Sequence, residues 1–318
     1  MLRTLICCLA LLMPVGAGAT LPAGVTLVPG HWTPGGQPDG NSVLFDGAEG
    51  LVLLDTGRHI DHARLLIETV RARGKPLRWI VNSHWHLDHI GGNAELRAAF
   101  PQARLMASDS IRGARSGFLA RYRGQVLEQL DKPDTSEAQR MAFRRELAII
   151  DNQAAQTPDV RVQATGEQAL AGRRFIVGLA RQAATAGDVW LHDIDARVLA
   201  SGDLVTLPVP FFDTACAERW SAALDTLAAQ SFEQLIPGHG PAMSREEFER
   251  YRRGFKALLL CAASTKPGPD CTSGWIDALG ELIPAAEQRL AKNYLGYYLE
   301  EHLRAAPDKA RAFCPKAG

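Results

Sequence analysis

The sequence has little of several features that would point to a particular partner. Its 318 residues contain 35 basic and 35 acidic side chains, and no segment concentrates Lys and Arg, which argues against a nucleic-acid partner. Beyond the N-terminus, no apolar run is long enough to span a bilayer. None of the six cysteines lies in a CxxC spacing, which argues against a zinc knuckle or a thioredoxin-like site. The oligomeric state stays open.

The first nineteen residues have the pattern of a secretory signal. Arg3 supplies a positive charge, residues 5–14 are apolar, and Ala17, Gly18 and Ala19 end the segment with small side chains. The apolar run is too short for a permanent membrane helix, although a retained anchor is the alternative. We therefore expect cleavage near Thr20, no membrane partner after cleavage, and a periplasmic or secreted protein.

Removal of residues 1–19 takes two cysteines with it and leaves four: Cys216, Cys261, Cys271 and Cys314. An even number in an oxidising compartment predicts disulfides, and four cysteines allow three connectivities. Free thiols packed as small hydrophobic side chains are the alternative. We favour a disulfide between Cys261 and Cys271.

The apolar pattern predicts an α/β protein. Strands are expected at 42–46, 50–54, 77–81, 160–162, 175–179, 189–191, 198–200 and 232–236, with those from 160 to 200 building a second sheet. Helices are expected at 60–74, 93–100, 217–229, 285–303 and after a capping-box signal at Ser244 and Glu247. Residues 109–152 predict two polar-faced helices divided at Lys132 and Pro133. We expect a core domain over 20–243, with 109–152 as an insertion that covers the pocket, and a C-terminal helical extension over 244–318.

Ligand-type side chains are densest directly after the strand expected at 77–81. Three imidazoles and one carboxylate lie within six residues: His84, His86, Asp88 and His89. Alternation places His84 and His86 on one side of the chain, and the turn that follows lets Asp88 and His89 face a second point. Each histidine alone would suit an ordinary surface or core position, but the cluster favours two adjacent metal sites. Nitrogen and carboxylate ligands suit zinc first, and iron or manganese less well.

This segment resembles the HxHxDH signature of the metallo-β-lactamase superfamily, and four further segments resemble that family in the expected order. Residues 51–57, LVLLDTG, are similar to the strand and turn before the signature, and Asn41 with Ser42 to a hairpin facing the metals. Residues 200–204, ASGDL, and 236–241, IPGHGP, are similar to the segments with the bridging aspartate and the last histidine. The resemblance implies an αββα four-layer sandwich of two mixed sheets between helical layers. It implies these metal ligands: His84, His86, Asp88, His89, Asp203 and His239.

One position departs from the family pattern. Where the family has a histidine at the start of an H-T-x-G-D segment, this chain has Ala184. The first site keeps two histidines and a share of Asp203, while the second keeps its full set. We therefore predict one or two zinc ions, with the second-site ion bound more tightly. Either His31 or His59 could substitute, or a water could fill the gap, whereas His192 lies too far along its strand.

The resemblance implies an exported metal-dependent hydrolase that acts on a small ester, thioester, lactone or lactam. Metal ions in such a site lower the pKa of bound water from about 16 to about 7, and Asp88 and Asp203 would take the catalytic roles. A non-catalytic, metal-binding accessory of another secreted enzyme system is the main alternative, and redox chemistry on an iron pair is a third. Asp55 is expected to orient a ligand imidazole or to cap its turn. Four aromatic residues are expected near the metals, with core packing as the alternative for at least two: Trp32, Trp85, Phe211 and Phe212.

Overall fold

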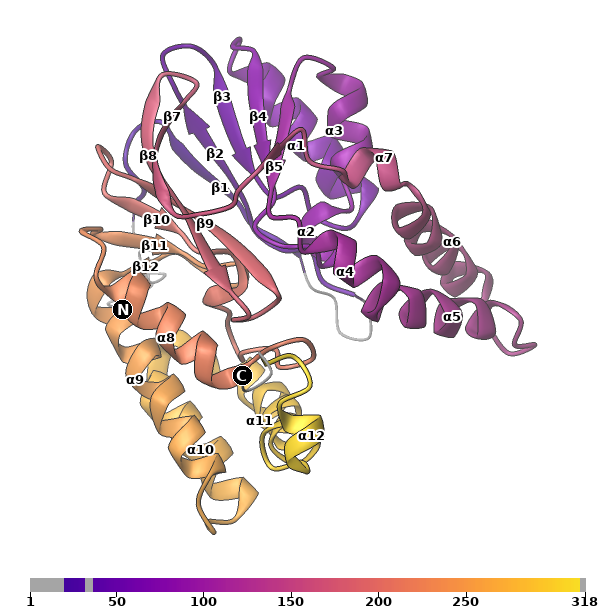
Figure 1. The fold of residues 1–318 in the computed structure, drawn as a ribbon, viewed down its shortest axis with the longest axis vertical. Coiled ribbons are helices and arrows are strands. Elements are labelled where there is room, and N and C mark those ends of the chain that lie inside the picture. Colours follow the sequence, from indigo (N-terminus) through magenta and orange to yellow (C-terminus); the bar gives the residue numbers. More distant parts are fainter. Residues whose placement is uncertain (1–19, 32–36, 315–318) are drawn as a thin grey trace, which may run out of the picture.

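The computed structural model describes residues 20–31 and 37–314, which form two six-stranded sheets with helices on their outer faces (Figure 1). The predicted secretory signal lies outside the described residues. The first sheet contains, in spatial order, β1 (Val25–Val28), β2 (Ser42–Asp46), β3 (Leu51–Leu54), β4 (Leu77–Val81), β5 (Arg104–Ala107) and β6 (Val160–Arg161). Its first three strands are antiparallel, and β3 to β6 run parallel, so this sheet is mixed.

The second sheet contains β12 (Met243–Ser244), β11 (Gln234–Ile236), β10 (Val198–Ala200), β9 (Gly187–Asp193), β8 (Arg173–Arg181) and β7 (Gly166–Leu170). Its neighbours are antiparallel except β10 and β11, which run parallel. The predicted sandwich of two mixed sheets is therefore confirmed. The placement of residues 160–162 in the second sheet is wrong, because β6 pairs with β5 at the edge of the first sheet.

Alternating residues of β2 and β3 explain why both strands are apolar throughout. Val43 and Phe45 point into the core between the sheets, where the Phe45 ring meets Phe175 of β8 with centroids 5.1 Å apart. Leu44 and the alternate leucines of β3 point outward, against helix α1 (Ile60–Ala72). A strand covered on both faces reads as a continuous hydrophobic run.

The second sheet is covered by α8 (Ala217–Ala228) and α9 (Arg245–Ala262), and the chain continues as α10 (Gly268–Leu279), α11 (Ala285–Tyr298), a π-helix (Leu299–Leu303) and α12 (Pro307–Ala310). The predicted capping box is present, since Ser244 and Glu247 bond reciprocally at the start of α9. The predicted disulfide between Cys261 and Cys271 is confirmed, and a second joins Cys216 to Cys314. The extension is thus covalently tied to the second sheet's helical layer.

The predicted insertion, residues 109–152, contains α4 (Ile111–Ser116), α5 (Phe118–Leu130) and α6 (Glu137–Asp151). Helix α7 (Gln153–Gln156) follows it, and α2 (Leu87–Ile90) and α3 (Asn93–Ala99) precede it. Helices α5 and α6 are the two predicted on either side of 132–133. Their apolar side chains pack around Trp85 and Leu87, so the insertion contacts the histidine motif directly. No helix among the described residues is both long and apolar enough to cross a membrane.

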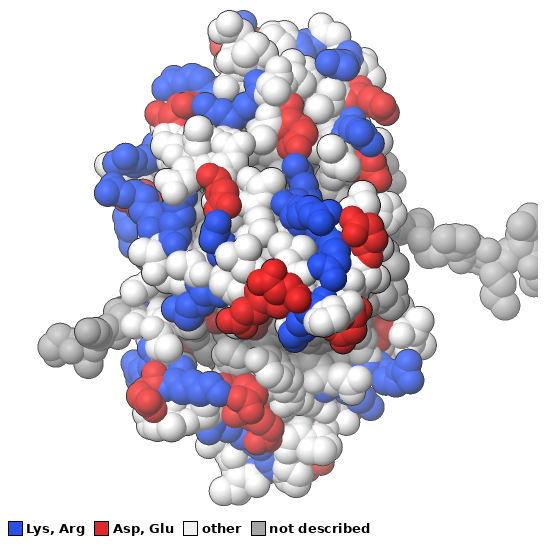
Figure 2. All heavy atoms as spheres, turned by 90° about the vertical axis from the view of Figure 1, so that its right-hand side faces the viewer, with Lys and Arg blue, Asp and Glu red and all other residues white. Residues whose placement is uncertain are grey.

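Charged side chains on the insertion side of the molecule are mixed in sign. Figure 2 shows basic and acidic groups lying next to one another on this face. Ion pairs account for part of this pattern, including Arg123 with Asp151 and Arg144 with Glu137. The face therefore presents no extended patch of a single charge.

Candidate metal centre

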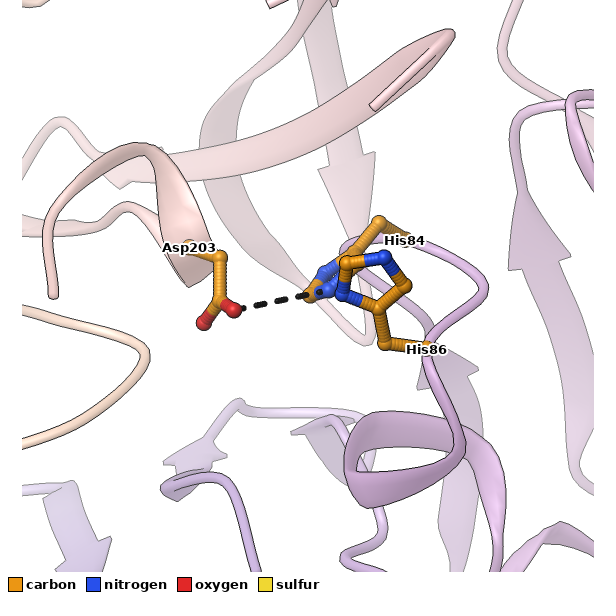
Figure 3. A group of neighbouring side chains, drawn as sticks. All are labelled: His84, His86 and Asp203. Atoms are coloured by element: carbon orange, nitrogen blue, oxygen red, sulfur yellow. Dashed lines mark ion pairs between the residues drawn. The ribbon is translucent and has the colours of Figure 1, made fainter. Parts of the chain in front are cut away.

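Three separate segments bring the six predicted site residues to one place. The HxHxDH motif follows β4, with His84 and His86 in the turn and Asp88 and His89 in α2. Asp203 lies in a short 3-10 turn, Gly202–Leu204, after β10, and His239 lies in the loop after β11. Donor atoms converge in two groups, each within 4.8 Å: His84, His86 and Asp203 in the first, and Asp88, His89 and His239 in the second. Figure 3 shows the first group.

Asp203 lies between the two groups and directs one oxygen to each. Its Oδ2 is 3.6 Å from Nε2 of His84, and its Oδ1 is 3.1 Å from Nε2 of His89 and 3.5 Å from Nε2 of His239. On the far side of the second group, Oδ2 of Asp88 is 3.1 Å from Nε2 of His239. If each group held an ion, Asp203 would supply one oxygen to each.

The donor set fits divalent cations. Nε2 of His84 and Oδ1 of Asp203 are buried without a hydrogen-bond partner, although buried polar atoms in proteins are ordinarily satisfied. Two imidazole nitrogens, Nε2 of His89 and Nε2 of His239, face each other at 3.3 Å. An ion at each group would use these lone pairs, and imidazole with carboxylate is a donor set that zinc accepts.

Two glycines make room for this convergence. A Cβ at Gly238 would lie 2.0 Å from Oδ1 of Asp203, and one at Gly40 would lie 2.3 Å from Cε1 of His89. Asn41 bonds through Nδ2 to the carbonyls of Pro237 and Gly240, which fastens the hairpin to the loop of His239. The Asn41 hairpin thus faces the centre, as predicted.

Asp55 makes the contact expected of a residue that orients a ligand imidazole. Its φ of +61° is a left-handed conformation that Asp tolerates better than most residues. Its Oδ2 lies 2.8 Å from Nδ1 of His89 and accepts from Oγ of Ser83 at 2.6 Å, while Oδ1 accepts from N of Ser83. Oγ of Ser83 in turn lies 2.9 Å from Nδ1 of His84. One carboxylate therefore supports histidines in both groups.

Two outer contacts of the centre carry no sequence signal and were not predicted. Arg58 is 8% exposed, lies 3.9 Å from Oδ1 of Asp88, and contacts Glu146 of α6. Thr214, in the loop before α8, lies 3.0 Å from Nε2 of His86. Single Arg and Thr residues at such distances along the chain have no recognisable spacing, so only the folded chain reveals them.

The surroundings shift the pKa values of His84 and His89 in opposite directions. Burial lowers the pKa of His84 well below its ordinary value. Burial also disfavours the charged form of His89, but the carboxylates of Asp203, Asp88 and Asp55 outweigh it and raise the pKa of His89 well above the usual value. Burial opposes ionisation of Asp88 too, yet nearby His89, His239 and Arg58 hold its pKa well below normal.

No substitute for the absent histidine reaches the donor groups among the described residues. His59 is paired through Nδ1 with Oδ2 of Asp39 at 2.8 Å, and His31 is exposed. His192 is buried in β9 opposite Leu199 of β10. None of the three belongs to either group. The first group therefore has three donors: two imidazoles and Asp203.

Two of the four aromatic residues lie beside the donor groups. The Trp85 ring is 4.5 Å from His86, and the half-buried Phe211 ring is 5.7 Å from His239, by centroids. Phe212 is buried against Trp220, which confirms core packing for that residue, while Trp32 lies outside the described residues. Of the Trp85 and Phe211 rings, Phe211 is the less buried and lies beside the second group.

Comparison with known proteins identifies the family. A family model for the metallo-beta-lactamase superfamily matches residues 35–245, and the chain belongs to that superfamily. The centre described above is thus that of a superfamily of metallohydrolases.

Individual relatives are more distant. A linear primary-alkylsulfatase from Pseudomonas sp. is 26% identical over 237 residues, which cover 66% of this chain and 43% of that protein. An atrochrysone carboxyl ACP thioesterase from Passalora fulva is 29% identical over 100 residues, 30% of each chain. The chain therefore spans less than half the length of either curated relative. A solved metallo-beta-lactamase family protein from Thermus thermophilus shares the fold, with a TM-score of 0.55, 18% identity, and coverage of 86% of this chain and 93% of that one.

Proposed function

We propose that this chain is an exported, zinc-dependent hydrolase that cleaves ester-type bonds in a small molecule. The observation that carries the proposal is the convergence of six ligand-type side chains in two groups, with the two oxygens of Asp203 divided between them. Nε2 of His84 in the first group, and Oδ1 of Asp203, which faces the second, are also buried without a hydrogen-bond partner, as expected of atoms that hold ions.

Divalent ions at such a centre would make water more acidic and polarise the bond under attack. The chain's own residues bind, orient and move protons. Asp203 directs one oxygen to each group, and Asp88 is kept ionised by the imidazoles and Arg58 around it, so that its carboxylate can accept hydrogen bonds and orient water. Asp55 keeps the His89 ring turned with Nε2 toward the centre.

The substrate class is supported by the relatives and by one side chain. An alkylsulfatase and a thioesterase both act on ester-type bonds, as their names state. The half-buried Phe211 ring beside His239 would contact an apolar group attached to such a bond. We therefore favour esters, thioesters and sulfate esters of apolar alcohols, thiols or acids over lactones and lactams.

Export is supported by the sequence pattern of residues 1–19 and by both disulfides. Disulfide bonds persist in oxidising compartments and are rare in the cytosol. These two observations together support a periplasmic or secreted location. Protease accessibility of the protein in intact cells, and the N-terminal residue of the mature chain, test it.

A second candidate function is a metal-binding accessory of another secreted enzyme. Ala184 favours this reading, because the first group has lost one imidazole relative to the family pattern. Against it, all six other ligand positions are occupied and brought together. A protein that binds zinc but turns over no substrate would support the accessory role.

The test is zinc counting combined with a panel of carboxylic ester, thioester, sulfate ester, lactone and lactam substrates. We expect wild type to bind one zinc tightly and a second weakly, and to cleave at least one ester. His239→Ala should abolish turnover, and the exposed His31→Ala should preserve it. Ala184→His should raise the affinity for the weaker zinc, which the first group would hold. Turnover that survives His239→Ala, or a wild type that binds no zinc, would contradict the proposal.

A further inference from the structure

We propose that Thr214 is a positioning residue of the first donor group, and that its hydroxyl holds His86 in the tautomer that presents Nδ1 to an ion. The identity of the ion in this inference rests on the proposed function. The assignment of the hydrogen bonds does not depend on it. Thr214 is only 2% exposed, and no family pattern named it among the site residues. The group it supports is the one that lacks an imidazole at Ala184.

The direction of two hydrogen bonds sets the tautomer. Oγ1 of Thr214 donates to the carbonyl oxygen of Ala184 at 3.1 Å. A hydroxyl has one hydrogen, so toward Nε2 of His86, 3.0 Å away, Thr214 can only accept. Nε2 of His86 therefore carries the proton, and Nδ1 keeps its lone pair. Figure 3 shows one ring nitrogen of His86 turned toward Asp203 and the other turned away, in agreement with this assignment.

The same logic governs the neighbouring imidazole of the first group. Oγ of Ser83 donates its hydrogen to Asp55, so Nδ1 of His84 must donate to Ser83. That leaves Nε2 of His84 as the free lone pair, and this atom is the buried, unpartnered one that faces Asp203. Both imidazoles of the first group thus present an unprotonated nitrogen to Asp203. His84 is set by its own sequence neighbour, and His86 by a residue 128 positions away.

The C-terminal extension holds Thr214 in place. Tyr298 of α11 donates to Oδ2 of the adjacent Asp213 at 2.6 Å, and N of Cys216 donates to the carbonyl of Ala183 at 2.9 Å. The disulfide from Cys216 to Cys314 pins the same loop to the end of the described chain. The loop that contains Thr214 is thus bonded at one end to the backbone beside Ala184 and at the other to the C-terminal extension. The Thr214 hydroxyl lies between Ala184 and His86.

A matched pair of variants isolates the hydroxyl. Thr214→Val keeps the shape and removes the hydroxyl, while Thr214→Ser keeps the hydroxyl and removes a methyl group. In metal-free protein labelled with ¹⁵N-histidine, we expect wild type and Thr214→Ser to show His86 protonated at Nε2, and Thr214→Val to shift toward Nδ1 protonation. Thermal unfolding confirms that both variants fold.

Zinc titration by chelator competition supplies the second readout. We expect Thr214→Val to weaken the weaker zinc by about 10- to 100-fold, as loss of an outer partner of a ligand histidine commonly does, with the tighter zinc unchanged. Thr214→Ser should stay close to wild type at both. Wild-type His86 protonated at Nδ1, or equal weaker-zinc affinity in wild type and Thr214→Val, would overturn the assignment. Absence of zinc binding in wild type would instead contradict the proposed function, so the two failures are distinguishable.

Discussion

The two donor groups of the candidate metal centre, called its first and second halves below, share Asp203. They differ in the residues that contact the ligands from outside the centre. In the second half, the outer partners are charged: Asp55 contacts His89, and Arg58 lies beside Asp88. In the first half they are neutral hydroxyls, Ser83 on His84 and Thr214 on His86. A carboxylate partner raises the basicity of a ligand imidazole as well as orienting it, whereas a hydroxyl mainly orients it.

The two halves also differ in the number of their ligands. The second half has three donors of its own and the Oδ1 atom of Asp203, while the first has two imidazoles and Oδ2 of Asp203. The Asp55 carboxylate behind His89 and the additional donor act in the same direction and favour a tighter ion in the second half. The structure thus supplies two independent physical reasons for unequal affinity, where the ligand count alone suggested one.

The largest effect is expected from removing the charge of Arg58, which lies beside the second half. Arg58→Met should destabilise the protein by about 3–5 kcal/mol, because it leaves the buried Glu146 carboxylate without its cation. Urea unfolding at pH 7 measures the free energy of unfolding. The double variant Arg58→Met/Glu146→Gln should recover most of the loss. A single variant within about 1 kcal/mol of wild type would show that the charges are not needed there.

Removing one ligand from each half compares the halves directly. If about 10–16 kcal/mol of zinc binding is shared among four donors, His239→Ala should cost about 3 kcal/mol, or about 100-fold in affinity for the tighter ion. His84→Ala should lower the affinity of the weaker ion and leave the tighter one nearly unchanged. Chelator competition measures both. Equal losses at both ions from either variant would abolish the distinction between the halves.

Asp55→Asn should have an intermediate effect on both halves. It removes the negative charge from the partner of His89 and weakens the acceptor of the Ser83 hydroxyl that supports His84. We expect zinc affinity to fall by about 10- to 100-fold, more at the tighter ion. Ser83→Ala is the matched control, because it should affect the weaker ion alone. A Ser83→Ala protein that loses the tighter ion would contradict this division.

The smallest effect concerns His59 and its partner Asp39. His59→Ala should leave both zinc affinities unchanged, because this imidazole is bonded to Asp39 and belongs to neither half. Isothermal titration of wild type and variant with zinc checks this. Loss of the weaker ion in His59→Ala would identify His59 as a substitute ligand after all.

The pair of His59 and Asp39 should have a small, pH-dependent effect on stability. The hydrogen bond that His59 donates to the Asp39 carboxylate raises the pKa of His59. The stability that this bond contributes is therefore complete below about pH 6.5 and is lost as pH rises through the folded-state pKa. Burial opposes ionisation of Asp39, but the His59 side chain and two backbone N–H groups lower its pKa, so its contribution disappears in acid. His59→Ala should therefore cost less than about 1 kcal/mol, and most between about pH 4 and 6.5. A larger loss at pH 8 than at pH 5.5 in urea unfolding would contradict this sign.

Local residue patterns determined much of the fold. The bounds of β2, β4 and β10 follow from short apolar runs between turn residues, and the capping box of α9 from Ser244 and Glu247. Strands β1, β5, β7 and β12 were not predicted, since each has at most five residues and is partly exposed. The sheet to which β6 belongs also could not be predicted, because strand pairing depends on which distant segment lies alongside.

The six candidate ligands could likewise be named from residue types and spacing, since His, Asp and their intervals are local properties of the chain. Only the tertiary structure decided which oxygen of Asp203 faces which group, and that Arg58 and Thr214 stand behind Asp88 and His86. These contacts join segments up to 128 residues apart. A side chain's hydrogen-bond partner is set by packing, and packing brings together residues whose separation along the chain carries no signal.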